Sequence, residues 1–401
     1  IGSGLIGCNG MGFEDLKAFL RNPEVECIAL SDIDENVLNN RAAETEKITG
    51  KKVKHLYKDW RKLIDNKDID LVIVGTPDHW HCLQMVSACQ AGKDVYCEKP
   101  LGNSIEECNI MVRAAQKYNR VVQVGQWQRS DPHWQDAMQF VHSGQLGKIR
   151  TVRVFSYQGW CPSIPVKPDE AVPAGVDYDM WLGPAPKRPF NRNRFHFTFR
   201  WFWDYAGGLM TDWGVHLLDY ALEGMNADLP TRVFSGGGKF AYPDDAMETP
   251  DTLMATYAYD DFNIIWDHAC GINHGLYNRK EGLAFYGENG TMVLDRAGWE
   301  VIPVVSNNVA RMEAVPFKKG EGKGLYNHVG NMLSCIKSRE LPNADVAIGA
   351  RVAKMAHLAN ISCRVQREVH WDDKNNLFVG DNEATALSKA YYRAPWELPK
   401  L

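Results

Sequence analysis

The stretch Gly2-Ser3-Gly4-Leu5-Ile6-Gly7, near the start of the 401-residue chain, decides the expected fold. It fits the pattern Gly-x-Gly-x-x-Gly, whose glycines permit a tight strand-to-helix turn and let backbone N–H groups approach a pyrophosphate. On this interpretation every residue of the stretch except Ser3 contributes to a phosphate-binding turn. The pattern alone is weak, because an ordinary flexible turn uses the same residues. Such a turn should also follow a strand of about five residues, so we expect the first strand to be missing from the start.

Residues 1 to about 125 alternate short apolar runs with amphipathic stretches, which is the pattern of βαβ units around a buried parallel sheet. The expected strands cover residues 26–31, 71–75, 94–97 and 121–124, and the expected helices cover residues 15–20, 35–46, 81–91 and 105–118. Right-handed crossovers between such units build a doubly wound sheet. We therefore predict an N-terminal Rossmann domain over residues 1–127.

From about residue 148 the strands alternate polar and apolar residues, which is typical of an antiparallel sheet. The expected strands cover residues 149–157, 252–259, 263–268, 281–286 and 290–295. An insertion rich in aromatic residues interrupts them at 160–205, and helices are expected at 210–222, 326–338 and 348–367. Residues 128–401 are therefore predicted to form an α+β domain for substrate binding and oligomerisation, with the C-terminal helices and tail.

Composition excludes several classes of protein. Hydrophobic residues make up 45% of the chain and charged residues 24%, as in globular proteins. The net charge of -5 offers no basic stripe, so we expect no nucleic-acid partner. No apolar run approaches the roughly 20 residues that a membrane helix needs, so we expect no membrane partner. The ten cysteines contain no Cys-x-x-Cys pair, which argues against a structural zinc site and indicates a reducing compartment.

The compartment depends on how the chain begins. The cytoplasm is the default expectation for this composition. The periplasm stays possible, because a removed signal peptide would be invisible if the start of the chain is missing.

An acidic residue follows the second expected strand. Asp32 lies 25 residues after Gly7, and an acidic side chain about 20 residues beyond the glycines binds the adenosine ribose hydroxyls in dinucleotide sites. A carboxylate there repels a 2′-phosphate, so NAD is favoured over NADP. Asp32 could instead cap a helix, but Asp34 is the better candidate for that role.

Two further motifs follow expected strands, at the edge where open parallel sheets bind ligands. The residues expected to line the cofactor are Thr76, Pro77, His79, His81, Glu98, Lys99 and Gln126. The two histidines have no third ligand at a suitable spacing, so we expect no metal. Lys99 can stabilise negative charge on a reacting oxygen, although a solvated surface lysine is the commoner alternative.

Asp212 and His216 are four residues apart in the expected helix 210–222, so their side chains should share one face. A histidine can accept a hydroxyl proton as a hydride leaves, and an aspartate can orient the site. The alternative is an ordinary pair of polar residues with hydrogen-bond partners. We predict that Lys99, Asp212 and His216 are catalytic.

Aromatic and polar side chains crowd the insertion and the segment before it. Aromatic faces pack against the C–H faces of sugars, and polar groups bond the hydroxyls. The expected substrate-binding residues are Trp127, Arg129, Trp160, Tyr178, His196, Arg200 and Trp201. Core packing is the alternative role for some of them.

Together these residues resemble the Gfo/Idh/MocA oxidoreductase family over essentially the whole chain. The resemblance rests, in order, on residues 2–7, 76–81, Glu98-Lys99-Pro100 and Asp212 with His216. It implies a Rossmann domain, a C-terminal domain with a large open and mostly antiparallel sheet, and nicotinamide bound at the interface. It also implies catalytic roles for Lys99, Asp212 and His216, a Lys99–Pro100 peptide that is often cis, and a homodimer or homotetramer.

The sequence thus predicts an NAD-dependent dehydrogenase that acts on a secondary hydroxyl of a sugar, glycoside or polyol. Two alternatives keep the nucleotide. One is a glycosidase that works by transient oxidation and elimination, and the other is a non-catalytic NAD-binding sensor or regulator.

Overall fold

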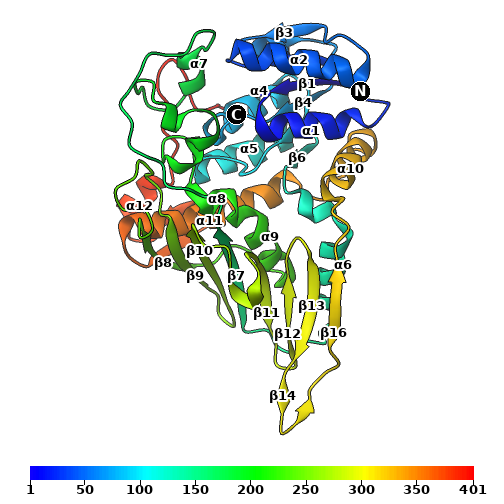
Figure 1. The fold of residues 1–401 in the computed structure, drawn as a ribbon, viewed down its shortest axis with the longest axis vertical. Coiled ribbons are helices and arrows are strands. Elements are labelled where there is room, and N and C mark those ends of the chain that lie inside the picture. Colours follow the sequence, from blue (N-terminus) through cyan, green and yellow to red (C-terminus); the bar gives the residue numbers. More distant parts are fainter.

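In the computed structural model, which describes residues 1–401, the chain folds around two large β-sheets (Figure 1). The first sheet has six strands in the order β3-β2-β1-β4-β5-β6, and every neighbouring pair is parallel. Its strands are β1 (Gly2–Ile6), β2 (Glu26–Ser31), β3 (His55–Tyr57), β4 (Leu71–Val74), β5 (Asp94–Cys97) and β6 (Val122–Val124). This order confirms the predicted doubly wound Rossmann sheet.

Five helices connect these strands, and α2 shows how capping residues fix the ends of a helix. They are α1 (Gly10–Leu20), α2 (Glu35–Thr49), α3 (Trp60–Asp65), α4 (His81–Gln90) and α5 (Ile105–Lys117). The Asp34 side chain accepts from the N–H of Asn36 at 3.0 Å and so caps α2. At the other end of α2, Gly50 takes the left-handed conformation that ends a helix.

The glycine-rich turn between β1 and α1 lies further along the chain than we expected. The residues from Gly2 to Ile6 form strand β1. The prediction that the first strand is missing was therefore wrong. Gly2 and Gly4 serve close packing, since a Cβ on Gly2 would lie 2.0 Å from the carbonyl oxygen of Asp68. Leu5 is fully buried in the core. The turn itself is Gly7-Cys8-Asn9-Gly10-Met11-Gly12, and Gly7 is its one residue from the expected set. Ile6, the last residue of β1, also lines the cavity described below.

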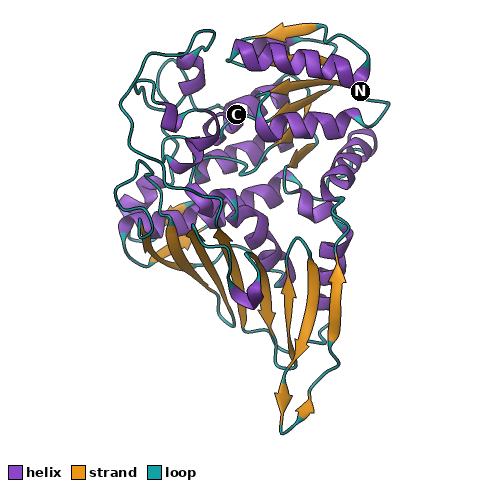
Figure 2. Ribbon diagram, viewed as in Figure 1, coloured by secondary structure: helices purple, strands orange, loops and turns teal.

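The second sheet has ten strands in the order β16-β13-β12-β11-β7-β10-β9-β8-β17-β18 (Figure 2). Only β7 and β10 pair in parallel, so the predicted open and mostly antiparallel sheet is confirmed. The strands are β7 (Thr151–Gln158), β8 (Arg232–Gly238), β9 (Thr252–Ala258), β10 (Asn263–Cys270), β11 (Glu281–Tyr286), β12 (Gly290–Leu294), β13 (Gly298–Pro303), β16 (Val315–Lys319), β17 (Val369–Asp372) and β18 (Leu377–Phe378). A ribbon of β14 (Val305–Ser306) and β15 (Val309–Ala310) projects beyond it.

The remaining helices are α6 (Pro132–His142), α7 (Tyr178–Leu182), α8 (Gly208–Asp212), α9 (Gly214–Gly224), α10 (Gly324–Ser338), α11 (Val346–Val365) and α12 (Asn382–Leu387). The single helix that we expected over 210–222 is wrong, because Trp213 separates α8 from α9. Asp212 therefore ends one helix, and His216 lies in the first turn of the next. No helix is both long enough and apolar enough to cross a membrane.

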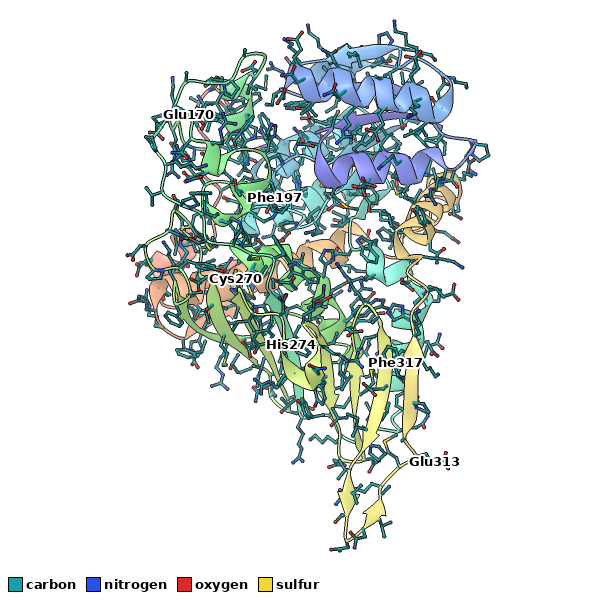
Figure 3. The ribbon with its side chains drawn as sticks, in the orientation of Figure 1. Glu170, Phe197, Cys270, His274, Glu313 and Phe317 are labelled. Atoms are coloured by element: carbon teal, nitrogen blue, oxygen red, sulfur yellow. The ribbon has the colours of Figure 1, made fainter.

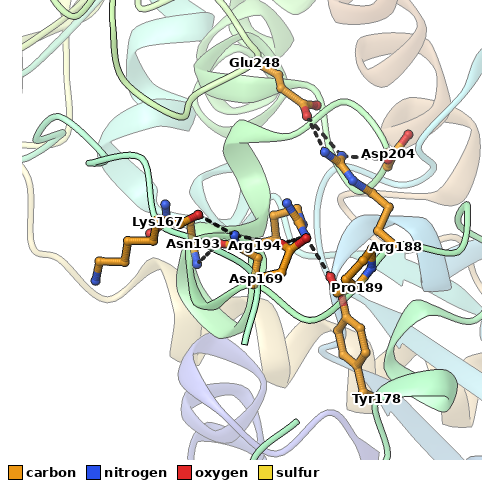
Figure 4. A network of polar contacts seen from close by, with 10 residues as sticks. Lys167, Asp169, Tyr178, Arg188, Pro189, Asn193, Arg194, Asp204 and Glu248 are labelled. Carbon is orange, nitrogen blue, oxygen red and sulfur yellow. Dashed lines mark hydrogen bonds and ion pairs between the residues drawn. The ribbon is translucent and has the colours of Figure 1, made fainter. Parts of the chain in front are cut away.

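The insertion over residues 160–205 has a small core of its own and touches the first sheet. Its polar contacts centre on Arg188, which pairs with Asp204 and Glu248, and on Arg194, which donates to the carbonyl oxygen of Pro189 (Figure 4). Two backbone hydrogen bonds anchor the insertion beside β2: Glu35 N–H donates to Gly175, and Asp177 N–H donates to Ile33. The insertion is thereby fixed over the edge where the first sheet carries its motifs.

Candidate active site

One cavity of about 690 Å³ lies between the first sheet, the insertion and helices α8 and α9. The first sheet contributes residues that follow β1, β2, β4 and β5, among them Gly7, Asp32, Thr76, Pro77, Glu98 and Lys99. The opposite wall includes Trp127, His196, Phe197, Phe199, Arg200, Asp212, Trp213, His216 and Arg296. Figure 3 labels Phe197 on the insertion. Residues from motifs that are far apart in the sequence thus line a single cavity.

The turn after β1 fits a dinucleotide. A Cβ on Gly12 would lie 2.4 Å from the carbonyl oxygen of Gly7, and one on Gly75 would lie 2.5 Å from the Cα of Gly12. The turns after β1 and β4 therefore pack backbone against backbone. On its open side, Gly10 has no atom within 4 Å of an added Cβ, and it begins helix α1. The positive end of a helix and its free N–H groups bind phosphate, so the residues present suit a pyrophosphate.

Replacing Gly12 by Ala is expected to weaken NADH binding by roughly tenfold or more. The new methyl group collides with the Gly7 carbonyl of the same turn, 2.4 Å away, and crowds the Gly75 Cα of the turn after β4, 3.1 Å away. NADH fluorescence titration measures the change. Gly236→Ala is the matched control, since a Cβ there meets no atom within 4 Å. Wild-type affinity in Gly12→Ala would contradict this account of the turn.

Asp32 lies in the cavity wall beside that turn. Its carboxylate accepts from Cys8 N–H at 2.7 Å and from Asp34 N–H at 2.9 Å. Burial raises the pKa of Asp32 above the ordinary carboxyl value, although these two N–H groups oppose the shift. The side chain is therefore held in one orientation at the end of β2, where it borders the cavity.

Lys99 and Asp212 form a partly buried ion pair across the cavity. Lys99 Nζ lies 2.7 Å from Asp212 Oδ1 and donates to the Asp212 carbonyl oxygen at 3.1 Å. Burial alone would raise the pKa of Asp212, but Lys99 and Arg200 outweigh it and lower the pKa to about 2. Asp212 is therefore a carboxylate at neutral pH. The Lys99–Pro100 peptide bond is cis, as the resemblance implied.

His216 is buried in the same wall, and its Nδ1 has no hydrogen-bond partner. The rings of Trp127 and Trp213 flank it at 6.4 and 6.1 Å between centroids. Burial, Lys99 and Arg296 lower the pKa of His216 well below its usual value, so the imidazole is neutral at neutral pH. Because Nδ1 is enclosed, the nitrogen of this neutral ring that can accept a proton from a molecule in the cavity is Nε2.

Only some of the residues expected to bind substrate reach the cavity. Trp127, His196 and Arg200 line it, but four others do not. Arg129 instead donates to Asp219 at 2.6 and 2.8 Å. Trp201 and Tyr178 are buried in the core of the insertion, and the half-exposed Trp160 packs against Phe197 outside the wall. Phe197, one of the aromatic residues of the insertion, lines the cavity as well. The predicted substrate-binding set did not include Phe199, Trp213 or Arg296, and the Arg296 guanidinium lies 4.3 Å from the centre of the Trp213 ring.

Three residues expected to bind cofactor have structural partners instead. His79 Nε2 lies 3.0 Å from the Trp181 carbonyl oxygen, and burial lowers its pKa to about 4. His81 lies between the carbonyl oxygens of Thr76 and Pro100 and so joins the segments after β4 and β5. Gln126 donates to the Val215 carbonyl oxygen at 3.5 Å. No group of three or more His, Cys, Asp or Glu side chains is arranged to hold a metal ion.

The fold is shared with solved oxidoreductases. The structure of a levoglucosan dehydrogenase in complex with NADH superimposes on this chain with a TM-score of 0.71 at 19% identity. The superposition covers 92% of this chain and 98% of the levoglucosan dehydrogenase chain. An oxidoreductase domain protein from Kribbella flavida gives a TM-score of 0.71 at 20% identity, over 93% of this chain and 99% of its own.

Two relatives illustrate the similarity in sequence. The uncharacterized oxidoreductase YrbE of Bacillus subtilis is 22% identical over 297 residues, which is 74% of each chain. Inositol 2-dehydrogenase 2 of Saccharopolyspora erythraea is 32% identical over 187 residues, which is 45% of this chain and 52% of that protein.

Two family models match consecutive parts of the chain. Residues 1–126 match the oxidoreductase family's NAD-binding Rossmann fold, and residues 135–398 match its C-terminal alpha/beta domain. These matches confirm the predicted oxidoreductase and its NAD cofactor. The chain therefore belongs to the Gfo/Idh/MocA oxidoreductase family.

Proposed function

We propose that this chain is an NAD-dependent dehydrogenase that reversibly oxidises a secondary hydroxyl of a sugar, glycoside or polyol. One observation carries the proposal: Lys99, Asp212 and His216 line the same cavity as the glycine turn after β1. Lys99 and Asp212 are 113 residues apart in the sequence and come from opposite walls. Such convergence is what a site for hydride and proton transfer requires.

The neutral imidazole of His216 accepts the proton of the substrate hydroxyl. The Lys99 ammonium group stabilises the negative charge that develops on the oxygen. Asp212 Oδ1 lies 2.7 Å from Lys99 Nζ, so Asp212 holds the lysine in place and balances the positive charge of its ammonium group. The turn after β1 and Asp32 would hold NAD, which would supply an acceptor for the hydride.

The wall of the cavity suits a carbohydrate. Trp127, Trp213, Phe197 and Phe199 supply aromatic faces for C–H groups, and Arg200 supplies N–H donors for hydroxyls. Two relatives whose names state a substrate, an inositol 2-dehydrogenase and a levoglucosan dehydrogenase, support a polyol or sugar.

The direct test incubates the purified chain with NAD and a panel that includes myo-inositol, levoglucosan and free aldoses, and follows NADH absorbance. We expect NADH formation with at least one of them. Tight NADH binding without turnover of any substrate would contradict the proposal. So would aglycone release from aryl glycosides with no NADH accumulation.

Replacing Asp32 by Ser is expected to narrow the preference for NADH over NADPH by about tenfold or more, since it removes the charge that repels a 2′-phosphate. Dissociation constants of NADH and NADPH, measured by fluorescence, give the ratio. Asp65→Ser, at the exposed end of α3, is the control. An unchanged ratio in Asp32→Ser would remove Asp32 from the selection of the nucleotide.

A further inference from the structure

A cationic side chain shares the two tryptophan rings that flank His216. Arg296 lies in the turn between β12 and β13 and lines the cavity. Its guanidinium carbon is 4.9 Å from the centre of the Trp127 ring and 4.3 Å from the centre of the Trp213 ring. The guanidinium is therefore held in the same wall as the imidazole that is proposed to accept the proton.

Arg296 has no acidic partner of its own. The two carboxylates whose charges reach it, Glu281 and Asp212, both lie beyond ion-pair distance. Its Nη2 donates to the side-chain oxygen of Gln128 at 3.1 Å, and its Nε is enclosed without a partner. Its Nη1 neither bonds to the protein nor is enclosed by it. A guanidinium carries five N–H donors, so most of those of Arg296 find no acceptor in the protein.

Positive charge exceeds negative charge in this part of the cavity. Asp212 lies 2.7 Å from Lys99 and 3.6 Å from Arg200, so one carboxylate already faces two cations besides the unpaired guanidinium. Asp78 and Glu98 also line the wall, but burial outweighs the nearby Lys99 and raises the pKa of both carboxyl groups, to about 8 for Asp78. Asp78 is therefore mostly uncharged at neutral pH. A bound anion would balance the excess positive charge.

We propose that Arg296 binds an anionic group of the substrate, so that the sugar taken by this site carries a carboxylate or a phosphate ester. Guanidinium groups bind both kinds of anion through charge-assisted N–H···O bonds. Stacking on Trp127 and Trp213 fixes the guanidinium before the substrate arrives, which lowers the entropic cost of binding. The inference rests on the proposed function, because it names the class of substrate for the same site.

The test measures sugar binding by isothermal titration calorimetry at saturating NADH, since binding needs no turnover. Each acid is compared with a neutral partner: D-galacturonate with D-galactose, D-gluconate with sorbitol, and D-glucose 6-phosphate with D-glucose. We expect the wild type to bind at least one acid about tenfold or more tightly than its neutral partner. A preference for galacturonate or gluconate identifies a carboxylate, and a preference for the sugar phosphate identifies a phosphate ester.

Arg296→Met keeps an apolar side chain that can pack on the two tryptophan rings, but it removes the charge and the N–H donors. This variant should lose about tenfold or more of the wild-type preference for the acid over its neutral partner. The anionic group does not react, so in turnover the loss should appear mainly in KM and not in kcat.

A matched control is available on α11. Arg364 stacks on Trp203 at 4.9 Å, much as Arg296 stacks on its two rings, but it does not line the cavity. Arg364→Met should therefore keep the wild-type preference.

Equal affinity of the wild type for every acid and its neutral partner would overturn the inference, and this comparison needs no variant to fold. An unchanged preference in Arg296→Met would overturn it as well. So would a loss of NADH affinity in that variant as large as the loss for the acid, because Arg296 would then serve the phosphates of the nucleotide.

These outcomes are distinct from a failure of the proposed function. If an acid binds through Arg296 but no sugar yields NADH, the dehydrogenase proposal fails and this inference stands. If neutral sugars are oxidised and acids bind no better than they do, the reverse holds.

Discussion

Replacing Lys99 by Met is expected to lower kcat/KM for sugar oxidation by roughly 10²- to 10³-fold, the usual effect of removing one group that stabilises a developing oxyanion. Methionine nearly matches the length of the lysine stem but carries no charge and no N–H donor. Asp212 then keeps Arg200, whose Nε lies 3.6 Å from its Oδ2, as its ion-pair partner, with Arg296 further away. The variant loses both the stabilisation of the oxygen and the ordered carboxylate.

Steady-state rates with a responsive sugar measure this loss, and NADH fluorescence shows whether the nucleotide site survives. We expect NADH affinity to change little. Lys99 follows β5, whereas Asp32 follows β2, and strands β1 and β4 lie between them in the sheet. The substitution also leaves the glycine turn untouched. Lys62→Met, on the exposed face of α3, is the control. Wild-type turnover in Lys99→Met would remove this residue from the mechanism.

Replacing His216 by Phe is expected to lower the hydride-transfer rate by roughly 10²- to 10⁴-fold, the range for loss of a general base. Phenylalanine keeps an aromatic ring between Trp127 and Trp213, so packing changes little, but it cannot accept a proton. His370→Phe, on the exposed side of β17, is the control. Single-turnover measurements separate this step from product release.

The pH profile provides a second check on His216. Its lowered pKa means that the ring stays neutral, and competent as a base, well below the usual value of about 6.5. The wild-type rate should therefore hold on moving from neutral pH down through 6.5 and fall only in more acidic solution. A loss of rate centred near pH 6.5 would contradict a buried, neutral His216.

Much of the first sheet could be predicted because its strands are short, mostly apolar runs that lie between helical patterns. β4 and β5 are buried at every position, and both were predicted to within one residue. The glycine turn was placed too early, since glycines that serve close packing in a strand look the same in sequence as glycines that serve a turn. Only the pairing of β1 with β2 and β4 distinguishes them.

The residues of the candidate site could be predicted where a sequence motif marks them. They could not be predicted where only the folding of distant segments brings them to the cavity. Lys99 and Asp212 were predicted because four motifs occur together and in order, although each motif alone is weak. Arg296 lies between β12 and β13, and only the three-dimensional path of the second sheet brings it to Trp213. Arg129 looked free in sequence, but Asp219 on α9 neutralises it, a partner 90 residues away.

The anchoring of the insertion beside β2 affects how fast a nucleotide can exchange. The bonds from Glu35 to Gly175 and from Asp177 to Ile33 hold a bridge of chain next to the cavity. A movement of the first sheet away from the insertion would break both bonds together. Each such hydrogen bond contributes roughly 1 kcal/mol to the stability of the closed arrangement. We expect the loss of these two bonds to shorten the residence time of a bound nucleotide, which would then depend on a segment remote from the chemistry.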